Sequence, residues 1–368
     1  MSVAAANRLT RAWAATLPGA AGTVLSGAGV YPLLSLLAGA AAGPAAAELS
    51  AVAPTPLVLP PDVKAAVGLW ARADVRLRPR FRDLVAGVLT DDPAPIDAWS
   101  NEHTGGLIPS IPVKIDEETR LVLAGALAIE TEWAEPFEDG EAHFDTGPWT
   151  GSWLWLYRSA PTLDGLAVLA TAAGPITAAT VRGRDNVDVV LLLGEENRGP
   201  AELLPAAIAA VTVPEPASAD ALRPLVDGAF TPEGPGVSVE RSELPGCTLS
   251  LPRFTVRAEH DLLAAAEVFG LGAATGATDA AGHFPGLAEE PLAVSGAAQS
   301  ATASFTALGF KAAASTYAAA GAGIPDLHHD MVYVSFDRPF GFLAVDRPTG
   351  LVLFAGWVGE PDPYIEDY

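Results

Sequence analysis

The sequence has almost no cysteine: Cys247 is the single one in 368 residues, so an intrachain disulfide is excluded. We expect its side chain to pack as a small apolar group. Basic residues are also scarce, with 21 Lys and Arg against 44 Asp and Glu and a formal net charge of −23. A surface this acidic repels a phosphate backbone, which indicates a soluble protein that does not bind nucleic acid.

Motifs for catalysis are absent as well. The sequence has no G-x-S-x-G turn, no H-E-x-x-H pair and no P-loop, so we expect no enzymatic activity and no cofactor. The run 270–276 resembles a dinucleotide fingerprint, but its last gap is one residue too long, and we interpret it as a loop. Asp326, His328, His329 and Asp330 carry metal-ligating groups, yet adjacent histidines diverge in an extended chain. We interpret them as a solvated polar loop and expect no metal.

Charged residues are missing between Arg11 and Glu48, a length that could span a bilayer. Pro18, Pro32 and Pro44 interrupt this segment, and its many Ala and Gly residues contribute little to membrane transfer. We therefore favour buried helices over a signal or anchor segment, and expect no membrane contact. Without a convincing signal peptide or a disulfide, the cytoplasm is the expected compartment, with export as the alternative.

Apolar residues, by contrast, are plentiful and spread over the whole chain, at 50% of the residues. We find no Ser/Gly linker, charge block or internal repeat that would mark a boundary. The sequence therefore predicts a single domain over residues 1–368, and we expect a monomer.

Helical patterns dominate the first part of the chain and strand patterns the rest. Apolar spacing predicts helices at 3–16, 31–42, 79–89 and 95–103, and a helix that runs into a strand at 62–70. Apolar runs between turn residues predict strands at 121–129, 153–156, 189–193, 248–251 and 331–345. This order indicates an α+β fold, with helices packed around a large, mixed but mostly antiparallel sheet.

Five blocks resemble, in the right order, motifs of the serpin family. They are Ile96–Trp99 with Thr104–Ile108, the run 121–139 with Trp133, Pro136 and Phe137, LPRFTVRAEHDL at 251–262, the run 283–309, and the block 336–361. The resemblance covers nearly the whole chain. It implies a serpin fold with an exposed reactive-centre loop, which in inhibitory members is cut by a serine protease and then inserts into the main sheet as a new strand.

In the segment 309–323, GFKAAASTYAAAGAG, residues 309–316 resemble the hinge of that loop, and residues 317–330 correspond to its bait region. Ala and Gly are poor strand formers, but such small residues could slide between two existing strands. Strand side chains alternate between two faces. Counted from Gly309, this register directs Phe310, Ala312, Ala314, Thr316 and Ala318 inward, and Lys311, Ala313, Ser315 and Tyr317 outward. Phe310 stands where inhibitory serpins usually have Thr or Ser, and its ring would have to enter a tight opening.

The resemblance also implies two regions that control the sheet. The shutter, a polar cluster beneath it, corresponds to Ser26, Gly29, Gly125 and Gln299, where small residues replace most of the polar groups. The breach at the top of the sheet corresponds to Trp133. The stretch 37–69 is shorter than its serpin counterpart, so we expect the helix that binds heparin-like cofactors in some members to be missing or reduced.

Two positions for the scissile bond stay open. Counting from Gly309 gives Gly323–Ile324, which would suit an elastase-like or subtilisin-like protease. Counting back from Pro339 gives a site near His328, where Leu327 would suit a chymotrypsin-like one. The sequence thus predicts a serine protease inhibitor that acts as a suicide substrate. The alternative is a non-inhibitory serpin-fold binding protein whose loop does not insert, which Phe310 and the altered shutter favour.

Overall fold

The computed structural model describes residues 2–19, 21–61, 63–113, 115–212, 219–221, 234–242, 246–276, 282–310 and 329–364. The described residues combine five α-helices with strands that pair mostly antiparallel, which confirms the predicted α+β class. The helices are α1 (Ser2–Ala14), α2 (Gly27–Ala38), α3 (Gly43–Val52), α4 (Ala94–His103) and α5 (Pro200–Val211). In the described ranges, no helix is long and apolar enough to cross a membrane.

Local capping decides where α2 begins. Ser26 precedes the helix in an extended conformation, and its Oγ accepts a hydrogen bond from the backbone N–H of Gly29 (2.9 Å). The helix predicted at 31–42 therefore overlaps α2 alone, which begins earlier, at Gly27, and ends at Ala38; Pro32 lies inside α2, and α3 begins only at Gly43. Between α3 and the next strand the described residues contain no helix.

A seven-stranded sheet forms the centre of the core. Its order is β1 (Thr23–Leu25), β19 (Leu351–Val358), β18 (Phe340–Asp346), β10 (Val187–Leu193), β9 (Gly174–Arg182), β8 (Leu166–Thr171) and β11 (Ala219–Ala221). β10, β18 and β19 are buried along their whole length, because α1, α2 and α5 pack on this sheet. Their continuous apolar runs are typical of strands covered on both faces.

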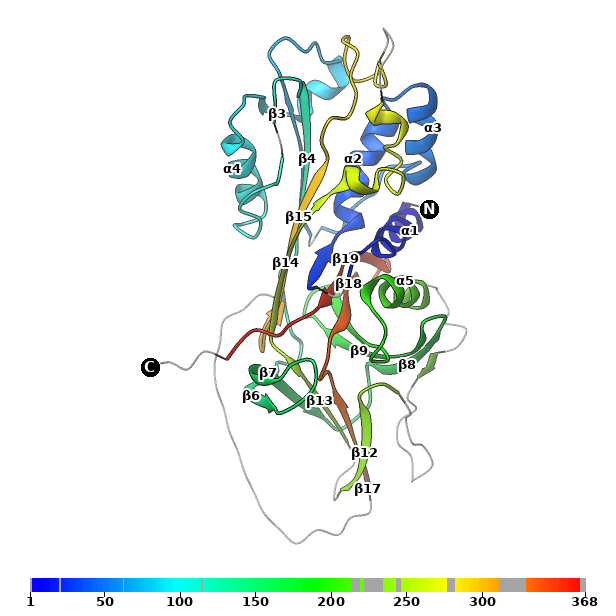
Figure 1. The fold of residues 1–368 in the computed structure, drawn as a ribbon, viewed down its shortest axis with the longest axis vertical. Coiled ribbons are helices and arrows are strands. Elements are labelled where there is room, and N and C mark those ends of the chain that lie inside the picture. The colour runs from blue at the N-terminus through cyan, green and yellow to red at the C-terminus, as the bar shows by residue number, and fades with distance from the viewer. Residues whose placement is uncertain are drawn as a thin grey trace.

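A five-stranded sheet lies at one end of the molecule and the strands β2, β3 and β4 lie at the other (Figure 1). The five-stranded order is β12 (Val237–Ser242), β17 (His329–Ser335), β13 (Gly246–Pro252), β7 (Gly151–Ala160) and β6 (Glu138–Phe144). β17 and β18 are separate strands in different sheets, whereas the sequence suggested one run at 331–345. The turn residues Asp337, Arg338 and Pro339 divide them.

The remaining strands form two ladders and one short pair. One ladder is β3 (Val85–Val88), β2 (Lys64–Ala71) and β4 (Leu121–Ala128); the other is β14 (Phe254–Asp261) and β15 (Ala298–Phe305); the short pair is β5 (Thr131–Glu132) and β16 (Gly309–Phe310). β2 replaces the helix-to-strand transition predicted at 62–70. Residues 79–89 form a 3₁₀ turn (Pro79–Leu84) followed by β3, so that helix prediction was wrong. In both places pairing within a sheet overrides the weak local helical pattern.

Candidate functional site

The ladder of β3, β2 and β4 and the ladder of β15 and β14 are the two halves of what we call the main sheet. This sheet is open between β4 and β15. In the described residues no ladder joins these two strands, although side chains from both line the same cavities. At one end, Val122 and residues 295–298 line a cavity of about 290 Å³. At the other end, Leu127 and Thr302 line a smaller one of about 30 Å³. Two neighbouring strands thus present backbone edges that could pair with a strand placed between them.

The start of the predicted hinge already lies at one end of this opening. β16 pairs antiparallel with β5, matching Gly309 with Glu132 and Phe310 with Thr131. A tight turn brings it back from β15, since the backbone N–H and the hydroxyl of Thr306 both donate to the Gly309 carbonyl (3.0 Å each). A Cβ at position 309 would collide with the carbonyl oxygen of Thr131, so this close approach requires glycine.

Phe310 is buried in the intact chain, with 3% of its surface exposed. Its ring centre lies 6.2 Å from that of Phe342, and its side chain lines the small cavity beside Leu107 and Leu127. The burial of Phe310 agrees with the inward direction that the strand register predicts for it. The expectation that its ring would have to enter a tight opening during insertion is wrong, because the ring is already buried in the intact chain.

Trp133 fixes the turn that leads into β16. The residue is fully buried, and its ring packs on Phe305 with a centroid distance of 4.6 Å. Its indole N–H donates to the carbonyl of Thr306 (2.9 Å), and its backbone N–H donates to that of Leu308 (2.9 Å). The residue assigned to the breach therefore holds both the end of β15 and the turn after it.

The four residues assigned to the shutter lie together beneath the opening. The amide of Gln299 binds the backbone of Ser26 twice, accepting from its N–H (2.8 Å) and donating to its carbonyl (2.9 Å). The Ser26 hydroxyl donates to the carbonyl of Leu353 (2.6 Å). Ser26 and Gln299 are both buried, at 1% and 7% exposed. A polar cluster is therefore present here, although the sequence indicated that small residues had largely replaced it.

Gly29 and Gly125 allow this cluster to sit close to the sheet. A Cβ at Gly125 would lie 3.0 Å from the carbonyl oxygen of Gly29, and one at Gly29 would lie 3.1 Å from the hydroxyl of Ser26. Both distances are shorter than ordinary contacts. The two glycines thus let the first turn of α2 pack directly against β4 and β15.

Sequence reasoning missed His260, which lies opposite Gln299 in the ladder between β14 and β15. Its Nε2 donates to the carbonyl of Val24 (2.9 Å), and its ring meets the edge of Trp13 at 5.0 Å. Burial lowers the pKa of this imidazole, and the hydrogen bond to Val24 offsets only part of the effect. Alternation within RFTVRAEHD predicts a strand here, but only the tertiary structure shows that this histidine faces inward.

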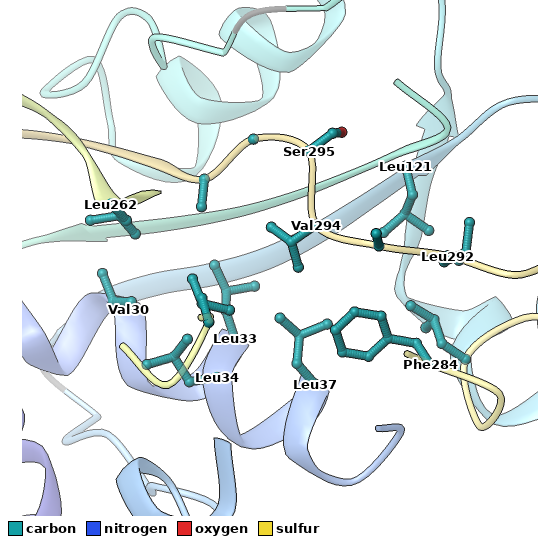
Figure 2. A pocket seen from close by; sticks show the side chains of 15 residues that line it. Val30, Leu33, Leu34, Leu37, Leu121, Leu262, Phe284, Leu292, Val294 and Ser295 are labelled. Atoms are coloured by element: carbon teal, nitrogen blue, oxygen red, sulfur yellow. The ribbon is translucent and has the colours of Figure 1, made fainter. Parts of the chain in front are cut away.

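An apolar cavity of about 50 Å³ lies beneath the same part of the sheet (Figure 2). Leu33 and Leu37 of α2, Leu121 of β4 and the segment that leads into β15 line it. Val294 points toward the α2 side chains, whereas the hydroxyl of Ser295 points away from them (Figure 2). The volume is far below that of a typical ligand pocket. We interpret it as a packing void between α2, β4 and the segment that precedes β15.

Several predicted site residues lie outside the described residues. They are the rest of the hinge (Lys311, Ala312, Ala313, Ala314, Ser315 and Thr316) and the scissile candidates (Gly323, Ile324, Leu327 and His328). Of the cluster at 326–330, His329 and Asp330 are described, and Asp330 pairs with Arg241. Among the described residues, no group of three or more His, Cys, Asp and Glu side chains could hold a metal. Cys247 is buried, and burial raises the pKa of its thiol to about 11.

Comparison with known proteins identifies the fold. Residues 237–361 match the family model of the serpins, described as serine protease inhibitors. The chain is similar to the native state of tengpin, a thermophilic serpin, with 17% identity, a TM-score of 0.71 and coverage of 97% of this chain and 93% of that one. It is also similar to Serpin48 of the insect Tenebrio molitor (16% identity, TM-score 0.68, 97% of each chain). A third similar structure is thyroxine-binding globulin in complex with thyroxine (18% identity, TM-score 0.69, 98% of this chain and 99% of that one). These findings confirm the resemblance to serpins and the serpin fold.

Proposed function

We propose that this chain, which has the serpin fold and matches the serpin family over residues 237–361, inhibits a serine-type protease as a suicide substrate. The protease serine attacks the carbonyl of the scissile residue, the peptide bond breaks, and the new amine leaves with the C-terminal part. The protease stays attached as an acyl ester. The N-terminal part of the loop then enters the main sheet and carries the protease with it before water cleaves the ester.

The position of β16 carries this proposal. Its two residues already pair antiparallel with β5, which follows β4 along the chain, and they turn back directly from the end of β15. A strand continuing from Phe310 would therefore run between β4 and β15, antiparallel to both. In the intact chain, β16 therefore lies where an inserting strand would begin, which supports the proposal.

The rest of the hinge suits the same path. In the register set by Phe310, the next inward positions are Ala312, Ala314 and Thr316, which are small enough to pass between two strands. Each inserted residue would pair backbone groups that β4 and β15 leave free toward each other. Insertion also buries the alternate side chains, so the cleaved chain is expected to be more stable than the intact one.

One observation favours a second candidate, a non-inhibitory serpin-fold binding protein. The buried ring of Phe310 anchors the start of the hinge in the intact chain and could hold the loop at that point. In that case the loop would be cut without further insertion. The two candidates therefore differ in the fate of the loop after cleavage.

The test is incubation with subtilisin-like, elastase-like, chymotrypsin-like and trypsin-like proteases, followed by denaturing gels, intact mass and the melting temperature of the cleaved product. An inhibitor gives a complex that survives SDS and a cleaved form that melts well above the intact chain. The mass of the released peptide distinguishes Gly323–Ile324 from a site near His328. The same proteases with the catalytic serine replaced by Ala serve as controls and form no covalent complex. Cleavage without a complex and without a rise in melting temperature supports the binding protein instead.

A further inference from the structure

β12 covers the outer edge of β17. The two strands pair antiparallel from Val237 with Val334 to Ser242 with His329, and the backbone N–H of Ser335 extends the ladder to the carbonyl of Gly236 (2.9 Å). On its other edge, β17 pairs in parallel with β13. β17 is thus an interior strand of the five-stranded sheet, and β12 takes the edge position.

Side-chain contacts hold β12 in place, in addition to its backbone hydrogen bonds. Val237 and Val239 pack against the hydrophobic core, on the face where Val332 and Val334 are fully buried. One step along this face, Arg241 pairs with Asp330 (3.1 Å), whose side chain is only 15% exposed. Ser238 and Glu240 point the other way, into solvent. The strand is therefore held on one face only, which provides matched positions for a test.

β12 is also tied to the central sheet just before it begins. The hydroxyl of Thr177 on β9 donates to the carbonyl of Pro235 (2.7 Å). Gly236 has a φ of +69°, and a Cβ there would collide with the carbonyl of Ser335 and with Leu193. The chain that enters β12 is thus fixed against β9 and β17 together.

The position of β17 matters because the chain that leaves Phe310 leads directly into this strand. Residues 311–328 join Phe310, at the opening of the main sheet, to His329, the first residue of β17. β17 lies at the end of the molecule opposite β2 and β4 (Figure 1). An uncut segment laid along the full length of β15 would have to run away from β17 and then return to it. If β17 left its sheet, its residues would supply extra length for that path, whereas a cut segment needs nothing from β17.

We propose that β12 is a clasp that keeps β17 in the five-stranded sheet, so that residues after Phe310 enter the main sheet only once the chain has been cut. This inference rests on the proposed function. An edge strand leaves a sheet when one ladder breaks, but β17 must break two. The clasp would preserve the inhibitor in its active, uncut form.

Two changes in the full-length protein test the clasp. Val239→Asp places a carboxylate on the face of β12 that packs against the core, and Ser238→Asp places the same group one residue earlier on the solvent face. Arg241→Glu turns the pair with Asp330 into a repulsion, and the double change Arg241→Glu with Asp330→Arg restores it. Arg241 is largely exposed, so this second change keeps the test available if Val239→Asp fails to fold.

The first measurement is amide hydrogen exchange in β17, compared with β7 in the same sheet. We expect exchange in residues 329–335 to be at least about tenfold faster in Val239→Asp and Arg241→Glu, with β7 unchanged. Ser238→Asp and the restored pair should behave as the wild type. Equal exchange of β17 in the wild type and in both test variants would overturn the clasp.

The second measurement is incubation of uncut protein just below its melting temperature. We expect the two test variants to convert at least about tenfold faster than the wild type to a form with unchanged mass, no inhibition and a higher melting temperature. Wild-type protein that converts as fast as the variants would also overturn the clasp. If the cleaved wild type gains no stability, the proposed inhibitor function fails, and the exchange measurement alone decides whether β12 holds β17.

Discussion

Phe310 shows how one side chain sets the starting point of the hinge. Its ring is buried in the intact chain, so its apolar surface is removed from water before any cleavage. Under the proposed function, insertion would begin from the following residue, and the ring would not be an obstacle that a cut loop has to carry inside. A smaller side chain would remove packing from both the intact and the cleaved forms.

We therefore expect Phe310→Thr to lower the free energy of unfolding of the intact chain by about 2–4 kcal/mol, because it leaves a cavity next to Phe342. We expect no increase in the rate of complex formation. Urea unfolding gives the first quantity and stopped-flow inhibition the second. A faster rate would show that the ring does obstruct insertion.

His260 makes the stability of the molecule depend on pH. Burial lowers its pKa from 6.5, so the unfolded chain takes up the proton more readily than the folded chain. The contribution of neutral His260 to the free energy of unfolding is therefore fully present above pH 6.5. It is lost as the pH falls from 6.5 through the lowered pKa of the folded state. His260→Gln can keep a donor toward Val24 but does not titrate. We expect the fall in unfolding free energy between pH 7.5 and pH 5.5 to be smaller in this variant; an equal fall would assign the effect to other groups.

At the scale of elements, Gln299 couples the start of α2 to β15. Its amide satisfies both backbone groups of Ser26, which are out of reach of water. Gln299→Leu keeps a side chain of similar size but leaves a buried N–H and a buried carbonyl without this partner.

We expect Gln299→Leu to cost about 1–3 kcal/mol of unfolding free energy, the cost of one unsatisfied buried group. The Ser26 N–H loses its partner, whereas the Ser26 carbonyl still accepts from the N–H of Val30 (3.3 Å). Ser300→Ala, on the opposite face of β15, is the matched control and should change stability by less than about 0.5 kcal/mol. Chemical denaturation of the three proteins at pH 7.5 measures both effects. Equal stability of Gln299→Leu and the wild type would mean that water or another group replaces the amide.

The strand register makes a second prediction at this scale. If the hinge inserts in the register of Phe310, a charge at position 312 has to enter the core, whereas one at 313 stays in solvent. We expect Ala312→Glu to be cleaved without forming a stable complex, and Ala313→Glu to retain complex formation. The ratio of complex to cleaved product on denaturing gels measures the difference. Loss of the complex in both variants, or in neither, would rule out this register.

At the scale of the molecule, the open main sheet is its most distinctive feature. β4 and β15 line shared cavities but have no common ladder in the described chain, and a small apolar void lies beneath them (Figure 2). Such an arrangement leaves a strand position unfilled. Any peptide with the hinge sequence should be able to fill it.

We expect a synthetic peptide of residues 311–322 to bind the intact protein, raise its melting temperature and abolish complex formation, while the protease still cleaves the chain. A peptide of the same length, identical except for Glu at the positions of Ala312 and Ala314, is the control and should have no effect. Thermal melts and protease assays at increasing peptide concentration measure this. Binding without loss of the complex would place the peptide elsewhere.

Individual residues could be predicted from the sequence where their role depends on the size or polarity of their own side chain. Gly309, Phe310, Ser26 and Gln299 could all be picked out, and the structure brings them to the sheet opening or beneath it. Sequence reasoning failed where pairing decides the outcome, as in β2 and β3, whose local spacing looks helical. It also missed β12, although Val237 and Val239 alternate with polar residues in the pattern of a half-buried strand.

The sequence by itself determined the serpin fold, the run of small residues after Phe310 and the absence of an intrachain disulfide, because these depend on residue types and their order along the chain. The tertiary structure alone decided that Phe310 is already buried, that Gln299 holds the backbone of Ser26, and that β12 encloses β17. Each of these depends on contacts between residues far apart in the chain, some of them more than 200 positions apart. Local composition does not specify such contacts, because the pairing of strand edges is decided only when the sheets assemble.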